Sequence, residues 1–287
     1  MAEVATYSIY STCIKQLMQE TQHLPSLPSL TLKIRSTLTS ENVNHQQLGE
    51  LISQDASLCV WIMREVQSPV YLTAEKPKTL FDAIRLLGLE NLGRIVTLHG
   101  LKSLFVFQRP KLQQLFDRAW QRQLFKASIC RVLATKLGYR PIEEAVVTSM
   151  LTEVGTLAIL SALTDAEEIP SQTTYLRLCR EYSKSLGAIV LRKWEIDDHY
   201  YQALTHSGNW HYHTPYQQGV PGLSEVVNLA LYHSVTLRTR NPSLPPLAEL
   251  PMYQHLPSEM RRLDRRGLLC IVTEDLQSIL DDTKRML

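Results

Sequence analysis

The 287-residue sequence lacks the features that mark several large classes of protein. It has no CxxC pair, and its five cysteines are widely separated and odd in number, which argues against a disulfide framework or a structural zinc site. No stretch approaches the roughly 18 uninterrupted apolar residues of a membrane-spanning helix. The N-terminus lacks the basic and apolar regions of a signal peptide. These absences predict a cytoplasmic protein that is not bound to a membrane.

Charge of one sign is also scarce, since 30 Lys and Arg residues are balanced by 28 Asp and Glu residues, for a formal net charge of +2. A dedicated nucleic-acid binder usually carries a concentrated basic excess, so nucleic acid is not expected as the partner. The sequence has neither the G-x-x-x-x-G-K-[ST] phosphate loop nor the G-x-S-x-G elbow of a serine hydrolase. P-loop and serine-nucleophile chemistry are therefore not expected.

The pattern of apolar residues is typical of helices throughout. Glycine is scarce, with 11 residues, and apolar positions recur every three or four residues in nearly every long segment, which predicts an all-α fold. Short helical patterns fill residues 1–108, and Arg109-Pro110 then interrupts the chain. Longer helical patterns follow in residues 109–287, apart from a proline-rich loop at residues 241–257. We therefore expect two helical domains with these boundaries.

Several local signals refine this prediction. Residues 3–20 can form an opening helix, and Thr79 should cap a helix that Gly88 interrupts. Residues 176–194 should form one or two helices, divided near Gly187. These signals each predict a boundary that a structure can test.

Four segments carry the most specific information about the fold. They read LPSLPSL, LISQDASLCVWIMREVQSPVY, TLFDAIRLLGLENLGRIV and EYSKSLGAIVLRKWEIDDHYYQALTHS. Together they resemble the HDOD family, a catalytically degenerate relative of the metal-dependent HD phosphohydrolases that is found in bacterial signalling proteins. The resemblance covers residues 20–235, and it departs from the family pattern at Ala56, where proline is usual. It implies a small N-terminal helical bundle packed on a degenerate HD-type helical core.

The resemblance also identifies where an HD enzyme would hold its metal. Such an enzyme needs several His and Asp side chains around cations that activate water. The first histidine corresponds to Arg122, whose fixed positive charge opposes a cation, and a later histidine corresponds to Ser183. The closing aspartate corresponds to Leu231, which has no lone pair to offer.

The central His-Asp pair of the HD enzymes corresponds to Thr152 and Glu153. A neutral threonine oxygen is a weak ligand, so Glu153 and His206 alone keep ligand chemistry, fewer than the roughly three protein ligands of a catalytic site. We therefore expect no enzyme, no metal and no cofactor. The candidate binding cleft at this vestigial site comprises Arg122, Thr152, Glu153, Ser183 and His206.

The apolar stripes predict how this vestigial site is built. Trp120 and Leu157 should lie in the core of the second domain, and the same scaffold should bring the vestigial residues together. Arg122 and Glu153 are then expected to be neighbours, with a guanidinium–carboxylate contact where a metal would bind.

Two other clusters offer alternative sites. His199, His206, His211 and His213 form the densest group of histidines, and aromatic residues interleave them. This segment is either a transition-metal or pH-sensing site or, as we favour, a helix end and loop, which could equally be an exposed recognition loop. A displaced site would combine Glu153 and His206 with His211 or His213.

Residues 262–287 are predicted as a final helical segment, which begins in the only compact basic run. This run is a candidate anion-binding site or a solvated helix face, and it consists of Arg261, Arg262, Arg265 and Arg266.

Two functions remain open from the sequence. The first is a non-enzymatic signal-transduction module that binds a regulatory or signalling protein, or a small nucleotide, at surfaces that include the old catalytic cleft. The alternative is a metal-dependent phosphohydrolase with the displaced metal site. Fold alone does not decide between them, because function depends on the residues of the site.

Overall fold

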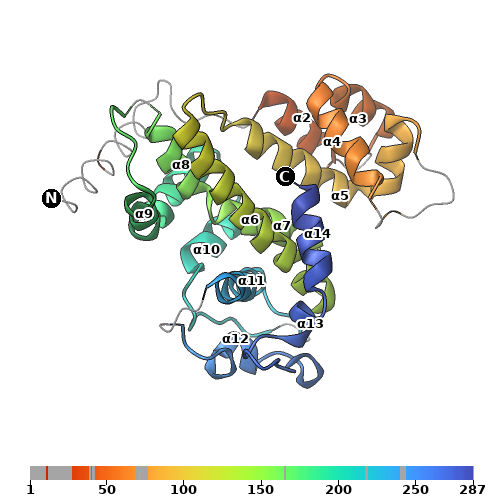
Figure 1. The fold of residues 1–287 in the computed structure, drawn as a ribbon. Coiled ribbons are helices and arrows are strands. Elements are labelled where there is room, and N and C mark those ends of the chain that lie inside the picture. Colours follow the sequence, from red (N-terminus) through yellow and green to blue (C-terminus); the bar gives the residue numbers. More distant parts are fainter. Residues whose placement is uncertain are drawn as a thin grey trace. The chain divides into compact units, whose positions relative to one another are not determined.

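The computed structural model contains helices, turns and loops, and within the described residues it has no strand beyond one isolated bridge between Leu263 and Leu269 (Figure 1). This confirms the predicted all-α fold. The predicted opening helix at residues 3–20 and the first part of LPSLPSL lie outside the described residues, apart from Ser11. The structure describes residue 11 and residues 28–38, 40, 43–68, 71, 77–164, 166–216, 219–239 and 244–286.

The chain divides into two compact units, and the smaller one spans Pro25–Val106. Its core consists of buried aliphatic side chains from all four of its described helices. These helices are α2 (Ser29–Leu38), α3 (His45–Ile52), α4 (Ala56–Val66) and α5 (Leu80–Ser103).

Side chains that cap helix N-termini fix the boundaries in this smaller unit. Asn44 accepts hydrogen bonds from two backbone amides at the start of α3, and Asp55 does the same for α4. Thr79 and Asp82 form a reciprocal capping box at the start of α5, as predicted for Thr79. Gly88 has a φ of 72°, so it kinks α5 at the predicted interruption.

The larger unit contains residues 107–287, and α6 (Pro110–Lys136) is its central helix. The other helices are α7 (Ile142–Leu151), α8 (Val154–Ala162), α9 (Gln172–Lys193), α10 (Asp198–His206), α11 (Leu223–Arg238), η2 (Leu247–Glu249), α12 (Pro251–Gln254), η3 (Ser258–Met260), α13 (Cys270–Thr273) and α14 (Leu276–Arg285). Figure 1 shows α7 and α14 beside α6, and both helices pack against it, as does α11.

The core of the larger unit follows the predicted apolar stripes. Trp120 is 1% exposed and Leu157 is 2% exposed, so the prediction that both are core residues is confirmed. Residues Ile142–Ala162 are apolar enough to pass for a membrane span by length and composition, but 89% of the most apolar stretch is buried inside the protein. Thr152 and Glu153 also divide this segment into α7 and α8.

Helices α8 and α9 approach so closely that their backbones meet. A Cβ atom on Gly155 would lie 1.7 Å from the carbonyl oxygen of Ser183, a distance that no real contact allows. On Gly187 the added atom would lie 3.3 Å from the backbone nitrogen of Gly155. The predicted division of α9 near Gly187 is therefore wrong, because this glycine serves close packing within a continuous helix.

The C-terminal segment also differs from the prediction. Residues 261–269 form a turn instead of the start of a long helix, because Asp264 accepts hydrogen bonds from the backbone amides of Arg266 and Leu268. Gly267 has a φ of 72°, which favours a turn over a helix. Two short helices, α13 and α14, follow this turn.

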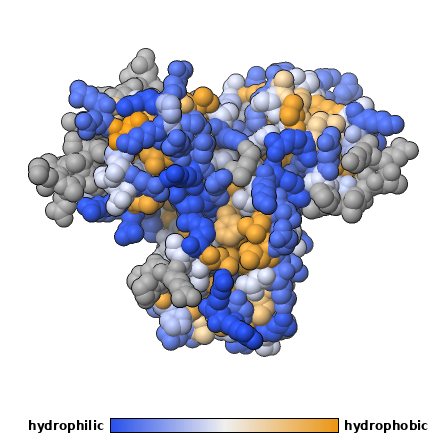
Figure 2. All heavy atoms as spheres, viewed as in Figure 1, coloured by the Kyte–Doolittle hydropathy of each residue, from blue (hydrophilic) through white to orange (hydrophobic). Residues whose placement is uncertain are grey.

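Hydrophilic residues cover most of the face in Figure 2, and hydrophobic residues gather in an area near its centre. Large hydrophobic side chains that are individually exposed belong to both units, among them Val60, Phe81 and Leu280. Scattered apolar residues of this kind are usual on protein surfaces and do not by themselves mark a binding site.

Candidate functional site

The vestigial site is built at the turn between α7 and α8. Thr152 follows the last residue of α7, and Glu153 precedes the first residue of α8. The hydroxyl of Thr152 donates a hydrogen bond to the carbonyl oxygen of Ser149, which fixes its rotamer. Both residues therefore project from a short turn between two buried helices.

Lys126 of α6 connects the two residues at this turn. Its ammonium group lies 2.8 Å from Oε1 of Glu153 and 2.9 Å from Oγ1 of Thr152, and it donates a hydrogen bond to each. The lysine side chain is 2% exposed and that of Glu153 is 31% exposed. A buried ammonium needs such partners, because leaving the charge unpaired inside a protein is costly.

Two arginines extend this charge cluster. Desolvation alone would raise the pKa of Glu153, but the attraction of Lys126, followed by that of Arg122 and Arg238, lowers the pKa overall. The pKa of Arg238 is lowered, first by desolvation and then by the like charge of Arg122. The negative charge of Glu153 partly offsets this lowering. The charges of the two guanidinium groups therefore act on the carboxylate and on each other.

Neighbouring groups on α9 add no negative charge to this cluster. Desolvation raises the pKa of Cys179 to about 11, and it raises the pKa of Tyr175 well above its ordinary value. Both side chains are influenced by Arg122 and Glu153, which places them beside the same cluster. The thiol and the phenol are therefore neutral near pH 7, and Glu153 supplies the negative charge.

The residues at this site do not fit a catalytic divalent metal. In an HD enzyme the residues at the positions of Thr152 and Glu153 ligate a cation, whereas here an ammonium group already hydrogen-bonds to both side chains. A divalent ion would meet the charge of Lys126 at short range and find one carboxylate to bind. The chemistry of the donors thus favours an internal ion pair at this position.

The five predicted site residues are brought together only in part. Thr152 and Glu153 share Lys126, and Arg122 acts on Glu153 through its charge. Ser183 lies where α9 approaches Gly155. His206 stacks on Tyr212 with ring centroids 3.6 Å apart, and its carbonyl oxygen accepts a hydrogen bond from Asn228. These contacts of His206 stabilise the C-terminal end of α10, and they do not involve the residues around Glu153.

Lys126 and Arg238 are site residues that sequence reasoning missed. One signal for Lys126 was available, because it follows Arg122 by four residues and so lies on the same face of the helix. It also interrupts the apolar run Leu124–Cys130, which is otherwise almost entirely nonpolar. Arg238 gave no such signal, since its place in the cluster depends on how α11 packs.

The other histidines make separate sets of contacts. Nε2 of His199 lies 3.1 Å from Oε1 of Glu144, whereas His213 stacks on His255 with ring centroids 3.8 Å apart. His211 is exposed. Within the described residues, no group of three or more His, Cys, Asp and Glu side chains is placed to hold a metal ion.

The basic run does not form one helix face in this structure. Arg262 pairs with Glu274, and Arg261 donates a hydrogen bond to the carbonyl oxygen of Gln254. Arg265 and Arg266 lie on the exposed turn that Asp264 stabilises. Two of the four arginines are thus engaged by neighbouring residues, and the anion-binding role of the run stays a prediction.

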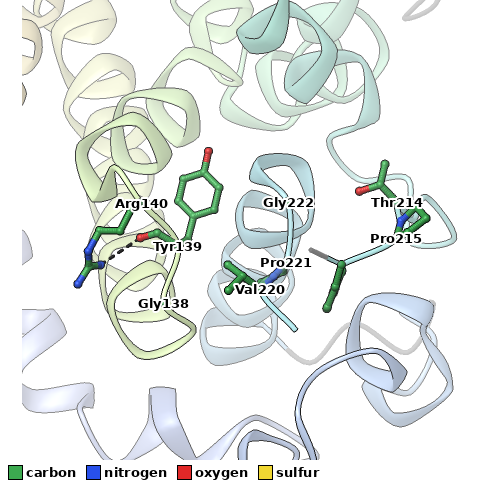
Figure 3. A pocket seen from close by; sticks show the side chains of 9 residues that line it. Gly138, Tyr139, Arg140, Thr214, Pro215, Val220, Pro221 and Gly222 are labelled. Atoms are coloured by element: carbon green, nitrogen blue, oxygen red, sulfur yellow. Dashed lines mark hydrogen bonds between the residues drawn. The ribbon is translucent and has the colours of Figure 1, made fainter. Parts of the chain in front are cut away.

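A pocket of about 870 Å³ lies at a different place in the larger unit (Figure 3). Two buried or half-buried acids hydrogen-bond to residues that line it. Oε1 of Glu225 accepts hydrogen bonds from the backbone amide and hydroxyl of Thr214, and Tyr139 donates a hydrogen bond to Glu144. Sequence reasoning missed this pocket, which is lined by Gly138, Tyr139, Arg140, Thr214, Pro215, Tyr216, Val220, Pro221 and Gly222.

A Ser-His-Asp contact occurs in the smaller unit. Oγ of Ser57 lies 2.6 Å from Nε2 of His99, and Nδ1 of His99 lies 3.6 Å from Oδ2 of Asp55. Asp55 is also the N-cap of α4, and its Oδ1 accepts hydrogen bonds from the Ser57 hydroxyl and from two backbone amides. This arrangement is accounted for by helix capping, in which Ser57 bonds the cap residue itself.

Comparison with known proteins identifies the fold as an all-α, HD-related one. The chain matches the HDOD domain over residues 24–210. It belongs to the HDOD domain family. No curated protein sequence matches the chain.

Solved bacterial structures share this fold at low sequence identity. A candidate metal-dependent phosphohydrolase from Shewanella amazonensis SB2B superposes with a TM-score of 0.71 at 17% identity, covering 98% of this chain and 97% of that one. An HDOD domain protein of unknown function from Geobacter sulfurreducens gives 0.66 at 18% identity, with the same coverage of 98% and 97%. A candidate signal transduction protein from Marinobacter aquaeolei VT8 gives 0.62 at 18% identity, covering 99% of this chain and 66% of that one.

Proposed function

We propose that this protein is a non-catalytic regulatory module of bacterial signalling that acts in the cytoplasm by binding another molecule. The binding partner is a regulatory or signalling protein, and the vestigial HD site is the place where a small ligand modulates that interaction. Membership of the HDOD family and the likeness to a candidate signal transduction protein support this proposal.

The observation that carries the proposal is the position of the Lys126 ammonium group. It hydrogen-bonds to both residues that stand where an HD enzyme has its central metal ligands. Hydrolysis by an HD enzyme depends on a metal-activated water at that point. Because Lys126 neutralises the remaining carboxylate, its position supports the proposal that this protein has kept the HD-type fold but lost the metal-dependent chemistry.

The alternative function, a phosphohydrolase with a displaced metal site, is favoured by the description of a structural neighbour as a candidate metal-dependent phosphohydrolase. That site would need Glu153 and His206 together with His211 or His213. In the described part of the chain, Glu153 pairs with Lys126, while His206 and His213 stack on other rings. These contacts favour the regulatory function over the alternative.

A hydrolysis assay tests this choice. Protein purified without a His-tag should not hydrolyse bis(p-nitrophenyl) phosphate in the presence of Mn²⁺, Fe²⁺ or Zn²⁺ faster than the Glu153→Ala variant does. Metal-dependent turnover that disappears in Glu153→Ala or His206→Ala would instead establish the phosphohydrolase. A pull-down from the native host would then identify the protein partner of the inactive module.

A further inference from the structure

The charges of three cationic side chains act on one carboxylate at the vestigial site, and one of them, Lys126, contacts it directly. Arg122 lies one helical turn before Lys126 on α6, so both side chains project from the same face of that helix. Arg238 is the last residue of α11, which packs against α6, and its charge acts on both Arg122 and Glu153. The three positive charges and the single negative charge of Glu153 leave a net local charge of +2.

The two arginines are the unsatisfied part of this cluster. Lys126 already donates hydrogen bonds to Glu153 and Thr152. Within the described residues, no hydrogen bond or ion pair is recorded for the guanidinium groups of Arg122 and Arg238. Two like charges that act on each other from packed helices, without separate acidic partners, favour the binding of an anion between them.

The cluster is also open to a ligand. Arg238 is exposed, Arg122 is half-buried and the Glu153 side chain is 31% exposed, so the arginines reach the protein surface. The guanidinium fork matches the geometry of phosphate oxygens and forms charge-assisted hydrogen bonds with them. The pocket of Figure 3 is a weaker candidate for an anion, because Arg140 is the single cationic residue among those that line it. Two other lining residues, Tyr139 and Thr214, hydrogen-bond to the acids Glu144 and Glu225.

We infer that Arg122 and Arg238 bind the phosphate group of a small phosphorylated molecule, beside the fixed Lys126–Glu153 ion pair. This inference rests on the proposed regulatory function, for which it supplies the chemical class of the ligand. An HD enzyme holds its phosphoester through metal ions. Here the positive charges belong to side chains, so the phosphate group binds without being hydrolysed.

Thermal melts in EDTA test this inference with two phosphate probes, adenosine monophosphate and inorganic phosphate. Adenosine and sodium chloride serve as controls, with ionic strength matched throughout. Both phosphate probes should raise the midpoint of the wild-type protein by several degrees, because a ligand that binds only the folded state stabilises it. Adenosine and chloride should leave the midpoint unchanged.

The variants assign this response to the two arginines. Arg122→Gln/Arg238→Gln should lose the response, and its midpoint without ligand should stay close to that of the wild type, because the repulsion that is removed offsets the lost attraction to Glu153. Arg265→Gln/Arg266→Gln, which alters the exposed basic turn, should keep the response. A response that survives in the first variant, or is lost only in the second, overturns the assignment.

The outcomes also separate this inference from the function on which it rests. If neither phosphate probe shifts the midpoint with EDTA or with Mn²⁺, the phosphate site is wrong and the regulatory function is untouched. If the shift requires Mn²⁺ and accompanies hydrolysis of the monophosphate, the non-catalytic function is wrong.

Discussion

Gly155→Ala should destabilise the protein by about 4 kcal/mol or more, at the severe end of single substitutions. The added Cβ would lie 1.7 Å from the carbonyl oxygen of Ser183 and 2.7 Å from the backbone nitrogen of Gly187. Both obstacles are backbone atoms of α9, so no side-chain rotation relieves the clash, and the two helices must move apart. Urea denaturation followed by circular dichroism measures this loss of stability.

Two matched glycine substitutions show how the loss of stability depends on the space around the added Cβ atom. In Gly187→Ala the added atom lies 3.3 Å from its nearest neighbours, so the loss should be clearly smaller than in Gly155→Ala. In Gly49→Ala the nearest atom is 4.0 Å away in an ordinary contact, and the higher helix propensity of alanine should offset any loss. Equal denaturation midpoints for all three variants would contradict the close approach of α8 and α9.

Glu153→Gln should destabilise the protein by about 2–4 kcal/mol. This loss is somewhat smaller than is typical when a fully buried ion pair is broken, because the Glu153 side chain is 31% exposed. The substitution leaves the ammonium of Lys126, whose side chain is 2% exposed, without its opposite charge. Lys126→Met should cost less, because the carboxylate that remains is partly solvated and lies near Arg122 and Arg238.

The double variant Lys126→Met/Glu153→Gln tests the coupling between the two residues. It should recover much of the loss seen in Glu153→Gln, because no unpaired buried charge remains. If the decrease in the free energy of unfolding in the double variant equals the sum of the decreases in the two single variants, the interaction between Lys126 and Glu153 contributes little to stability.

The effect of Glu153→Gln should also depend on pH. The pKa of Glu153 is lowered in the folded protein from its ordinary value of 4.5, so the ion pair contributes its full stability above that value. The contribution disappears as pH falls through the folded-state pKa. The difference in stability between wild type and Glu153→Gln should therefore shrink in acid.

The all-α fold was predictable because it depends on patterns local to each helix. Apolar spacing placed Trp120 and Leu157 in the core, and the hydroxyl of Thr79 marked a helix start that the structure confirms. Gly187 was misinterpreted because a glycine in sequence looks the same whether it ends a helix or permits close packing. The two roles can be distinguished only from the position in the fold of Gly155, which is distant from Gly187 in the sequence.

The family pattern gave a position for each residue of the vestigial site, but it did not give the contacts of those residues. Thr152 and Glu153 were identified in this way, but the partner of the carboxylate was expected to be Arg122, and the ion pair is made by Lys126. Arg122 and Lys126 lie on one face of α6, so either could approach Glu153. Which of them forms the ion pair depends on the details of helix packing, which residue spacing does not determine. His206 was assigned to the same site, whereas its recorded contacts are with Tyr212 and Asn228.

The central claim is that an internal lysine, and not a metal ion, neutralises the carboxylate at the old HD site. Thermal melts of untagged protein in EDTA and in excess Mn²⁺ test this claim directly, because an ion that binds only the folded state raises the midpoint. The two midpoints should coincide. A rise of several degrees with Mn²⁺ that disappears in Glu153→Ala or His206→Ala would contradict the claim.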